Sequence, residues 1–329
     1  MKAIVQDVYG SADVLGLRDI DMPDLQDEEV LVRVRAAGVD RGVWHLMTGR
    51  PYLMRIMGFG FRAPKNPVRG REVAGVVTAV GKDVTGFRIG DEVFGIGEGS
   101  FAEYVRVRAD KLARKPANLS FEQAAVVAIS GSTALQGIRD QGQVDTGQKV
   151  LIIGASGGVG TFAVQIAKSF GAEVTGVCST TKVDLVRSLG ADHVIDYTRE
   201  DFAEREHHFD VILDTGGHST LSHLRRALAP KGTLVIVGSE TDGRLLGGFD
   251  RSIRAMLLSP FVGQKLIAFT NSENAGDLVA LTELIEAEKV MPVTDRSFEL
   301  GEASKAIHYL KDGHARGKIA ITVPIPVTS

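Results

Sequence analysis

The clearest chemical signal in the sequence is a group of glycines that follows an apolar run. Residues 149–153 have the composition of a buried strand, and glycines follow at 154, 157, 158 and 160. Apolar residues then recur at helical spacing up to Phe170, so the stretch predicts a strand, a tight turn and a helix. In such a turn Gly154 changes the chain direction, Gly157 leaves the backbone open to a diphosphate, and Gly160 lets the helix pack closely on the strand. Because the first N–H groups of a helix attract anions, we predict a dinucleotide site here.

The end of the next expected strand, 173–178, indicates which dinucleotide is bound. NAD sites place an Asp or Glu at this point, whose carboxylate binds the ribose 2′-hydroxyl and would repel a 2′-phosphate. This chain has Ser179 and Lys182 instead, a hydroxyl and a cation that suit a phosphate. We therefore predict NADPH as the cofactor. The alternative is that Ser179 caps the following helix and that Lys182 is a solvated residue of its first turn.

Composition and charge favour a protein that acts on small molecules. The chain has 329 residues, of which 44% are hydrophobic and 24% charged, with a net charge of −3. This length suits two domains, and the slight negative charge argues against electrostatic binding of nucleic acid. No run of 18 uncharged apolar residues occurs, and Asp7 comes too early for a secretory signal, so we expect a cytoplasmic protein. Cys178 is the single cysteine, which excludes an internal disulfide and a cysteine cage for zinc.

The apolar pattern divides the chain into two kinds of structure. Alternation with a period of two predicts an antiparallel, β-rich half over residues 1–123. From 124 to 270 short apolar strands alternate with helical segments, which is typical of an α/β, doubly wound parallel sheet. Two helices and an alternating strand at 318–323 follow, so we assign 271–329 to the first domain. The six strands of the parallel sheet are expected at 150–153, 173–178, 193–197, 210–214, 233–238 and 265–269.

Two further groups of residues follow from this organisation. Ligands bind at the carboxyl ends of such strands, so Gly238, Ser239 and Phe269 are candidates for the nicotinamide end. The stretch 44–64 has no clear period but many large apolar groups, so we interpret it as a loop that lines an apolar pocket or forms its lid. Packing on the domain core or on another subunit is the alternative. The expected pocket residues are Trp44, Met47, Phe59 and Phe61.

A series of motifs resembles the medium-chain dehydrogenase/reductase superfamily, specifically its zinc-free quinone oxidoreductase-like branch. The motifs are AGVD at 37–40, GREVAGVV at 70–77, GFRIGDEV at 86–93, GSFAEY at 99–104, the glycine loop, LGADHVIDY at 189–197 and FDVILD at 209–214. The resemblance implies a GroES-like catalytic domain, a Rossmann cofactor domain and a cleft between them. It also implies NADPH-dependent reduction of quinones or α,β-unsaturated carbonyl compounds, and a homodimer formed through the edge of the cofactor sheet.

The departures from the zinc-dependent relatives bear on the chemistry. Zinc alcohol dehydrogenases of the superfamily carry a cysteine at the position of Asp40 and Gly-His-Glu at the position of 70–72. With both ligands replaced, we expect a reaction without zinc. Two alternatives remain open: a metal-dependent alcohol dehydrogenase that uses Asp40, His45 and Glu72, and a cofactor-binding sensor without turnover. Arg71 beside Glu72 favours a salt-bridged cluster over a metal site.

The resemblance also assigns individual residues. Quinone reductases have an asparagine at the position of Asp40, so we expect this carboxyl to be paired with Arg41 or Arg71, or to be protonated. Tyr52 resembles the tyrosine acid of enoyl-thioester reductases and is the expected proton donor, with pocket lining as the alternative. Lys318 resembles a basic residue near the cofactor phosphates, although a surface cation would look the same. The expected cofactor residues are Gly154, Ser156, Gly157, Gly158 and Val159 at the diphosphate, Ser179, Lys182 and Tyr197 at the 2′-phosphate, Thr133 at the nicotinamide, and Lys318.

Overall fold

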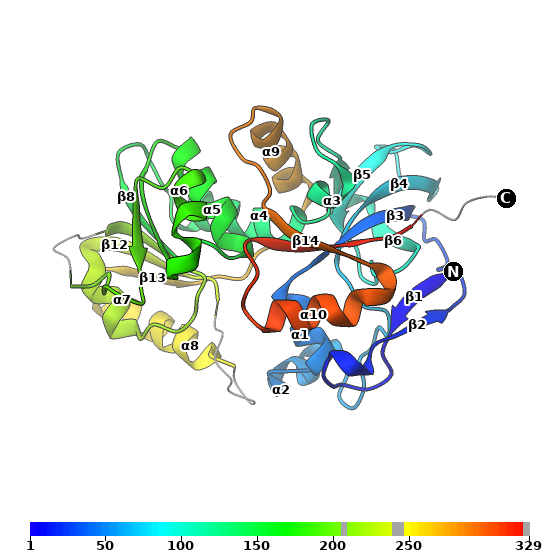
Figure 1. The fold of residues 1–329 in the computed structure, drawn as a ribbon, viewed down its shortest axis with the longest axis horizontal. Coiled ribbons are helices and arrows are strands. Elements are labelled where there is room, and N and C mark those ends of the chain that lie inside the picture. The colour runs from blue at the N-terminus through cyan, green and yellow to red at the C-terminus, as the bar shows by residue number, and fades with distance from the viewer. Residues whose placement is uncertain (205–208, 239–246, 325–329) are drawn as a thin grey trace. The chain divides into compact units, whose positions relative to one another are not determined.

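The chain folds into two compact units of different sheet type. The computed structural model describes residues 1–204, 209–238 and 247–324. The first unit comprises Met1–Ser130, Glu273–Ala287 and Pro292–Ser329, and the second comprises Gly131–Ser272 and Glu288–Met291. The first contains a mainly antiparallel sheet and the second a parallel sheet with helices beside it (Figure 1). The expected α/β class, with a β-rich part and a doubly wound parallel sheet, is confirmed.

The sheet of the first unit has seven strands and joins distant parts of the sequence. Its order is β14-β15-β3-β4-β5-β7, with β6 also paired to β3. Every strand pair within residues 1–123 is antiparallel, as predicted, and the one parallel pair of this sheet joins β14 and β15. A separate hairpin pairs β1 (Lys2–Val5) with β2 (Gly16–Asp19). The seven strands are β3 (Glu29–Val39), β4 (Glu72–Val80), β5 (Glu92–Ile96), β6 (Tyr104–Arg108), β7 (Leu112–Arg114), β14 (Thr294–Glu299) and β15 (Lys318–Thr322).

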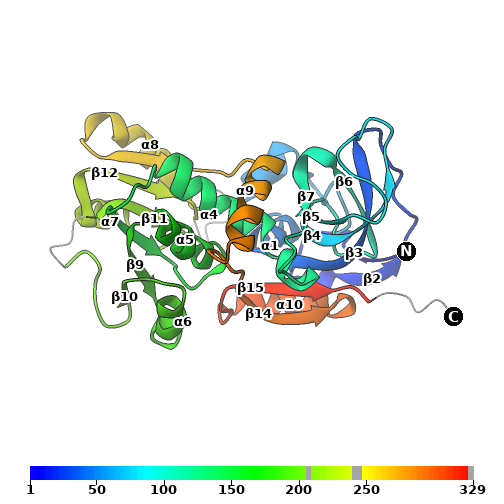
Figure 2. The same cartoon turned by 90° about the horizontal axis from the view of Figure 1, so that it is seen from above.

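The core of this unit lies under the central strands. Along β3 the side chains of Val30, Val32 and Val34 are buried, as the alternation of the sequence predicts. Helix α10 packs against β14 and β15 (Figure 2). The helices are α1 (Arg41–Thr48), α2 (Tyr52–Met54), α3 (Phe121–Ala124), α9 (Ala275–Glu286) and α10 (Ala303–Lys311), and α4 (Ala128–Leu135) begins here and continues into the second unit.

The stretch 44–64, interpreted from the sequence as a loop, is largely helical up to Phe59. Helix α1 starts because a carboxylate oxygen of Asp40 accepts a hydrogen bond from the N–H of Val43 at 3.0 Å, and it ends at Gly49, whose φ is +59°. Helix α2 and a π-helical turn over Arg55–Phe59 follow. The interpretation as a loop is wrong for this part of the stretch, because the N-cap at Asp40 starts a helix that the sequence pattern does not predict.

The second unit is a six-stranded parallel sheet with the order β10-β9-β8-β11-β12-β13. The strand order reverses between β8 and β11, so the carboxyl ends of these two strands form the switch point where such sheets bind ligands. Six strands were expected in this part of the chain, and the largest difference is at β12, which was expected at 233–238 and begins at Leu228. They are β8 (Lys149–Ile153), β9 (Glu173–Cys178), β10 (His193–Asp196), β11 (Phe209–Asp214), β12 (Leu228–Ile236) and β13 (Lys265–Ala268).

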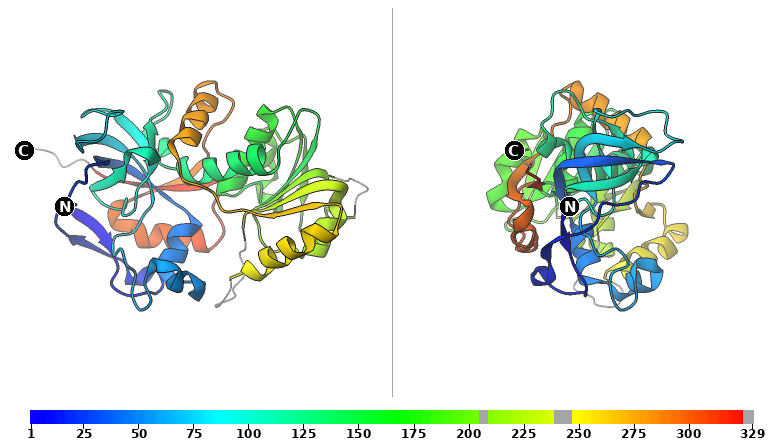
Figure 3. Two further views of the ribbon diagram at one scale, coloured as in Figure 1. Left: turned by 180° about the vertical axis from the view of Figure 1, so that it is seen from behind. Right: turned by 90° about the vertical axis from the view of Figure 1, so that its right-hand side faces the viewer.

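Helices connect and cover these strands. Helix α5 contacts β8 and β9, and α8, drawn in yellow in Figure 3, lies against the edge strand β13. The sheet is buried because its strands are almost entirely apolar, with Leu151, Ile212 and Leu234 fully covered. The helices are α5 (Gly158–Ser169), α6 (Val183–Ser188), α7 (Leu221–Ala227) and α8 (Phe249–Leu258). Within the described residues no helix combines the length and hydropathy needed to cross a lipid bilayer.

Candidate functional site

The glycine loop has the geometry that the sequence predicts. Gly154 ends β8 with a φ of +82°, and a Cβ there would lie 2.6 Å from Oγ1 of Thr215. A Cβ on Gly160 would lie 2.1 Å from the carbonyl oxygen of Gly154, so only glycine lets α5 approach the turn this closely. The N–H of Gly157 donates to the carbonyl of Gly154 at 3.0 Å, which closes the turn.

Helix α5 begins without a side-chain cap. Gly157 is the N-cap residue and provides no side-chain acceptor, while Gly158 and Val159 form the first turn. The first N–H groups of an α-helix have no partner within the helix, and the helix dipole adds positive potential at this end. Ser156, just before the cap, is buried. The twelve-residue helix therefore presents uncapped N–H groups at the carboxyl end of β8.

The ends of β9 and β10 form an edge rich in hydroxyl groups. The Ser179 side chain makes no capping hydrogen bond, so the alternative in which it caps the next helix is wrong. Asp196, which ends β10, accepts from the hydroxyls of Thr180 at 2.5 Å and Thr198 at 2.7 Å. The hydrogen bond from Thr180 is the main reason that the pKa of Asp196 is lowered. Both oxygens of this carboxylate thus accept hydrogen bonds from side chains of the protein.

Two of the expected 2′-phosphate residues flank this edge. Lys182 is half-buried at the end of a 3₁₀ turn, and Tyr197 follows β10 with 62% of its surface exposed. The structure therefore brings Ser179, Lys182 and Tyr197 to neighbouring strand ends, because β9 and β10 pair in parallel and Asp196 lies opposite Cys178.

The expected nicotinamide residues lie on other elements of the same unit. Gly238 follows β12, and a Cβ there would lie 2.6 Å from the carbonyl oxygen of Thr215. Phe269 follows β13, where its N–H donates to the carbonyl of Ile236 at 3.0 Å. Thr133 is buried in α4. Ser239 lies outside the described residues. Because Gly154 and Gly238 both contact Thr215, the ends of β8, β11 and β12 converge on that residue.

A buried ion pair at the switch point was not anticipated from the sequence. Asp214 ends β11 with no exposed surface, and its Oδ2 accepts from Nη1 of Arg251 at 2.6 Å. Arg251 also donates to the carbonyl of Gly238 at 2.7 Å, so it braces the ends of β11 and β12. An aspartate at the end of an apolar strand was a visible signal, but its partner lies 37 residues away and no local pattern could identify it.

In the first unit, Asp40 is a buried carboxylate with one oxygen unused. Asp40 is 8% exposed, and Oδ1 caps α1, whereas Oδ2 is buried and has no hydrogen-bond partner among the described residues. The expected partner Arg71 pairs with Glu273 instead, and Lys111 Nζ reaches the same carboxylate at 2.7 Å. Asp40 therefore caps the helix with Oδ1, while Oδ2 is buried without a hydrogen-bond partner among the described residues.

Glu72 and Lys318 form a fully buried ion pair beside Asp40. Glu72 is 0% and Lys318 is 3% exposed, and the Lys318 ammonium donates to Oε2 of Glu72. Oε1 accepts from the N–H of Ile129 at 2.8 Å. Burial raises the pKa of Glu72, the charge of Lys318 opposes this, and the charge of Asp40 adds to it. The expected Arg71–Glu72 cluster is wrong, and Lys318 is neither a surface cation nor an exposed ligand for phosphate.

The donor set considered for a metal is not assembled. His45 Nδ1 lies 2.8 Å from the carbonyl oxygen of Arg50, and both oxygens of Glu72 are used by the protein. Across residues 1–204, 209–238 and 247–324, no three His, Cys, Asp or Glu side chains are grouped so that they could hold a metal ion. The alternative based on Asp40, His45 and Glu72 therefore does not fit this structure.

The expected pocket residues separate into different environments. Met47 lies in the core at 1% exposure, and Trp44 packs against that core. Phe61 is exposed, whereas Phe59 lines a cavity of about 790 Å³ in the first unit. The ring of Tyr52 lies 4.7 Å from the guanidinium carbon of Arg55 and is half-buried, and its hydroxyl makes no hydrogen bond to the described residues.

Comparisons with known proteins match both units. A family model described as an alcohol dehydrogenase GroES-like domain matches residues 26–117, and one described as a zinc-binding dehydrogenase matches residues 189–321. The chain is 34% identical to 2-methylene-furan-3-one reductase of Solanum lycopersicum, covering 99% of this chain and 80% of that protein. It is 33% identical to NADPH-dependent alkenal/one oxidoreductase of Arabidopsis thaliana, over 99% of this chain and 80% of that protein. The quinone oxidoreductase structure from Coxiella burnetii matches with a TM-score of 0.84 and 30% identity, over 98% of this chain and 99% of that one.

Proposed function

Because the chain belongs to the quinone oxidoreductase-like branch of the medium-chain dehydrogenase/reductase superfamily, we propose that it reduces quinones or α,β-unsaturated carbonyl compounds with NADPH and without a metal ion. The main support for this proposal is that α5 begins without a side-chain cap and that the nearby ends of β9 and β10 contain hydroxyl groups and a lysine. The names of the tomato and Arabidopsis relatives, an enone reductase and an alkenal/one oxidoreductase, support the same substrate class.

The second unit fits the cofactor. The N–H groups of Gly158 and Val159 can bind the diphosphate, because no side chain caps them and Gly157 leaves the approach open. Ser179 and Lys182 can bind the 2′-phosphate, and the carboxylate of Asp196 at the same edge is held by Thr180 and Thr198. When bound, NADPH supplies a hydride to the electrophilic carbon of the substrate.

The first unit offers two groups that can hold a proton. Reduction of a conjugated carbonyl leaves negative charge on oxygen, which hydrogen-bond donors stabilise before protonation. The Tyr52 hydroxyl and Asp40 Oδ2 both lack a hydrogen-bond partner among the described residues. We propose Tyr52 as the proton donor, with Arg55 holding its ring, and Asp40 as a second group that can carry a proton at Oδ2.

The proposal is tested by mixing the purified protein with NADPH and a panel of quinones, enones and enals, and following the loss of NADPH absorbance. We expect oxidation with at least one member of the panel, weaker activity with NADH, and no loss of activity with a chelator. Tight NADPH binding without oxidation of any panel member would support a sensor instead. Stoichiometric zinc by elemental analysis, together with loss of activity on chelation, would support a metal-dependent alcohol dehydrogenase.

We also propose that the protein forms a homodimer through the edge of the second sheet. The outer edge of β13 pairs with no strand of the described residues. The adjacent α8 exposes Ile253, Met256 and Leu257, which are 51%, 60% and 68% exposed and lie on one helical stripe. A free edge and an apolar stripe together suit a symmetric contact. Sedimentation velocity should give a dimer that Met256→Lys weakens, and a monomer at micromolar concentration would contradict the proposal.

A further inference from the structure

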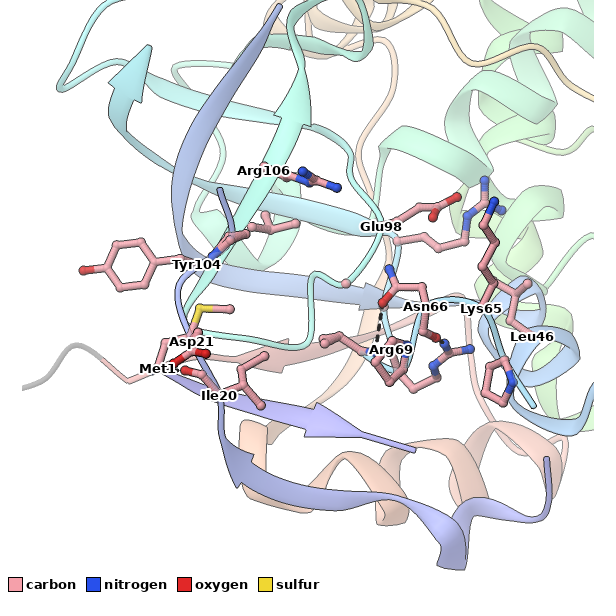
Figure 4. A pocket seen from close by; sticks show the side chains of 18 of the residues that line it. Met1, Ile20, Asp21, Leu46, Lys65, Asn66, Arg69, Glu98, Tyr104 and Arg106 are labelled. Carbon is pink, nitrogen blue, oxygen red and sulfur yellow. Dashed lines mark hydrogen bonds between the residues drawn. The ribbon is translucent and has the colours of Figure 1, made fainter. Parts of the chain in front are cut away.

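The cavity of the first unit contains a charged residue that the proposed reaction does not use. Arg69 lies among its lining residues, which come from the segment 64–71, from α1, from the chain just outside β1 and β2, and from residues 58–59 and 98–106. Figure 4 shows Lys65, Asn66, Arg69 and Leu46 in one part of this cavity and Met1, Ile20 and Asp21 in another. The backbone holds Arg69 in place, because its N–H donates to Ile4 at 3.1 Å and its carbonyl accepts from Phe101 at 2.9 Å.

Arg69 carries a buried positive charge that forms no ion pair with the described residues, although the negative charge of Glu98 in the same cavity acts on it. The residue is 5% exposed, its Nη2 donates to the carbonyl oxygen of Asn66, and its Nε is buried without any partner. Burial lowers the pKa of Arg69 to about 10, with Tyr9 and Glu98 opposing this, so the guanidinium remains protonated at neutral pH. Burying a cation without an ion-pair partner makes folding less favourable, and a bound anion would offset this cost.

The surroundings of Arg69 suit an anion attached to an apolar chain. Leu46, Phe59 and Val68 contribute apolar surface to the cavity. Lys65 adds a second, exposed cation that forms no ion pair with the described residues. Glu98 also lines the cavity, but it is exposed and makes no ion pair with Arg69. The site thus combines a fixed guanidinium fork with an apolar wall, and carboxylates match such a fork geometrically.

The cavity also reaches helix α1, whose N-cap is Asp40. Val43 and Leu46 line it from α1, which Asp40 caps, and Arg71 lines it two residues beyond Arg69. We propose that Arg69 binds a carboxylate of the substrate, so that the preferred substrates are unsaturated carbonyl compounds with an acid group at the end of an apolar chain. This inference rests on the proposed reductase function for the identity of the reacting group, but the anion site itself can be measured without turnover.

The binding test uses octanoate and its neutral analogue 1-octanol, titrated calorimetrically into the wild type, Arg69→Met and Arg62→Met. We expect octanoate to bind the wild type about 10- to 100-fold more tightly than octanol, the range of a charge-assisted hydrogen bond to a buried partner. Arg69→Met should lose this difference. Arg62→Met is the matched control and should retain it, because Arg62 is exposed on the same segment and does not line the cavity.

Thermal unfolding first establishes that Arg69→Met is folded, and Arg69→Gln serves as a second neutral variant. The comparison of octanoate with octanol on the wild type decides the question even if neither variant folds. Equal affinities of the wild type for the two probes, or undiminished octanoate binding by a folded Arg69→Met, would overturn the proposal.

A second measurement separates this inference from the proposed function. An enone with a terminal carboxylate and its methyl ester are compared as substrates in the NADPH assay. We expect kcat/KM for the acid to exceed that for the ester about tenfold or more in the wild type and in Arg62→Met, and the ratio to fall toward one in Arg69→Met. Equal reduction of acid and ester by the wild type would refute the carboxylate site while the reductase function stands. Arg69-dependent binding of octanoate without reduction of either compound would refute the reductase function and support the site.

Discussion

Replacing Lys318 by methionine tests the buried ion pair with Glu72. The substitution keeps an apolar stem of similar length but removes the ammonium, so the Glu72 carboxylate, which is 0% exposed, keeps only the N–H of Ile129 as a partner. Removing one member of a buried pair costs about 3–5 kcal/mol. For a unit of this size each kcal/mol lowers the Tm by about 2–4 °C, so we expect Lys318→Met to lower it by roughly 6–20 °C.

The pH dependence of this loss identifies its cause. Without Lys318 the pKa of Glu72 rises further above its ordinary value of 4.5, because burial and the charge of Asp40 are then opposed only by the hydrogen bond from Ile129. A carboxyl with a raised pKa in the folded state favours folding of the protonated form, so this stability is present below about 4.5 and is lost as the pH rises through the folded-state pKa. We therefore expect the deficit in Tm to be smaller at pH 5 than at pH 8.

The assay is calorimetric thermal unfolding of the wild type and three variants at both pH values. The double variant Glu72→Gln/Lys318→Met leaves no buried charge in the pair and should recover most of the lost stability. Lys305→Met removes an exposed ammonium that pairs with Glu302, and it serves as the control with an unchanged Tm. The reasoning is refuted if Lys318→Met unfolds at the wild-type temperature, or if the double variant is as unstable as the single one at pH 8.

Three further predictions concern the candidate sites. Gly160→Ala places a Cβ 2.1 Å from the carbonyl oxygen of Gly154, so it should lower the Tm and weaken NADPH binding at least tenfold in a fluorescence titration, whereas Gly86→Ala, with open space around it, should do neither. Lys182→Ala should raise the KM for NADPH more than the KM for NADH. The control Lys149→Ala, at the amino end of β8, should leave both KM values unchanged. Equal effects of Lys182→Ala on both cofactors would argue against a phosphate contact. Tyr52→Phe should reduce kcat about 100-fold without changing the Kd for NADPH, and unchanged turnover would reduce Tyr52 to a lining residue.

The features that could be predicted from the sequence are those that depend on residues close together in the chain. The glycine loop and its flanking strand and helix depend on residues within about one turn of one another, so the roles of Gly154 and Gly160 follow from their spacing in the chain. The strands of the second sheet followed from short apolar runs in the same way. These features require no knowledge of distant partners.

What could not be predicted depends on contacts between residues far apart in the chain. Lys318 pairs with a residue 246 positions away, so its burial could not be inferred from the alternating strand around it. The pairing of Asp214 with Arg251 could not be predicted either, because the two residues are 37 positions apart. Helix α1 was missed because its apolar stripe is short and because its start depends on a single side-chain hydrogen bond to Asp40.

The position of β15 between β14 and β3 has a consequence for how the protein is made on the ribosome. Residues 131–272 form nearly all of the second unit and are contiguous, so they can fold as soon as they have left the exit tunnel. The first unit must wait, because β15, an inner strand of its sheet, is synthesised after all residues of the second unit. The edge of β3 that pairs with β15 therefore stays unpaired until β15 has been synthesised, and during this period the nascent chain needs protection from association with other chains.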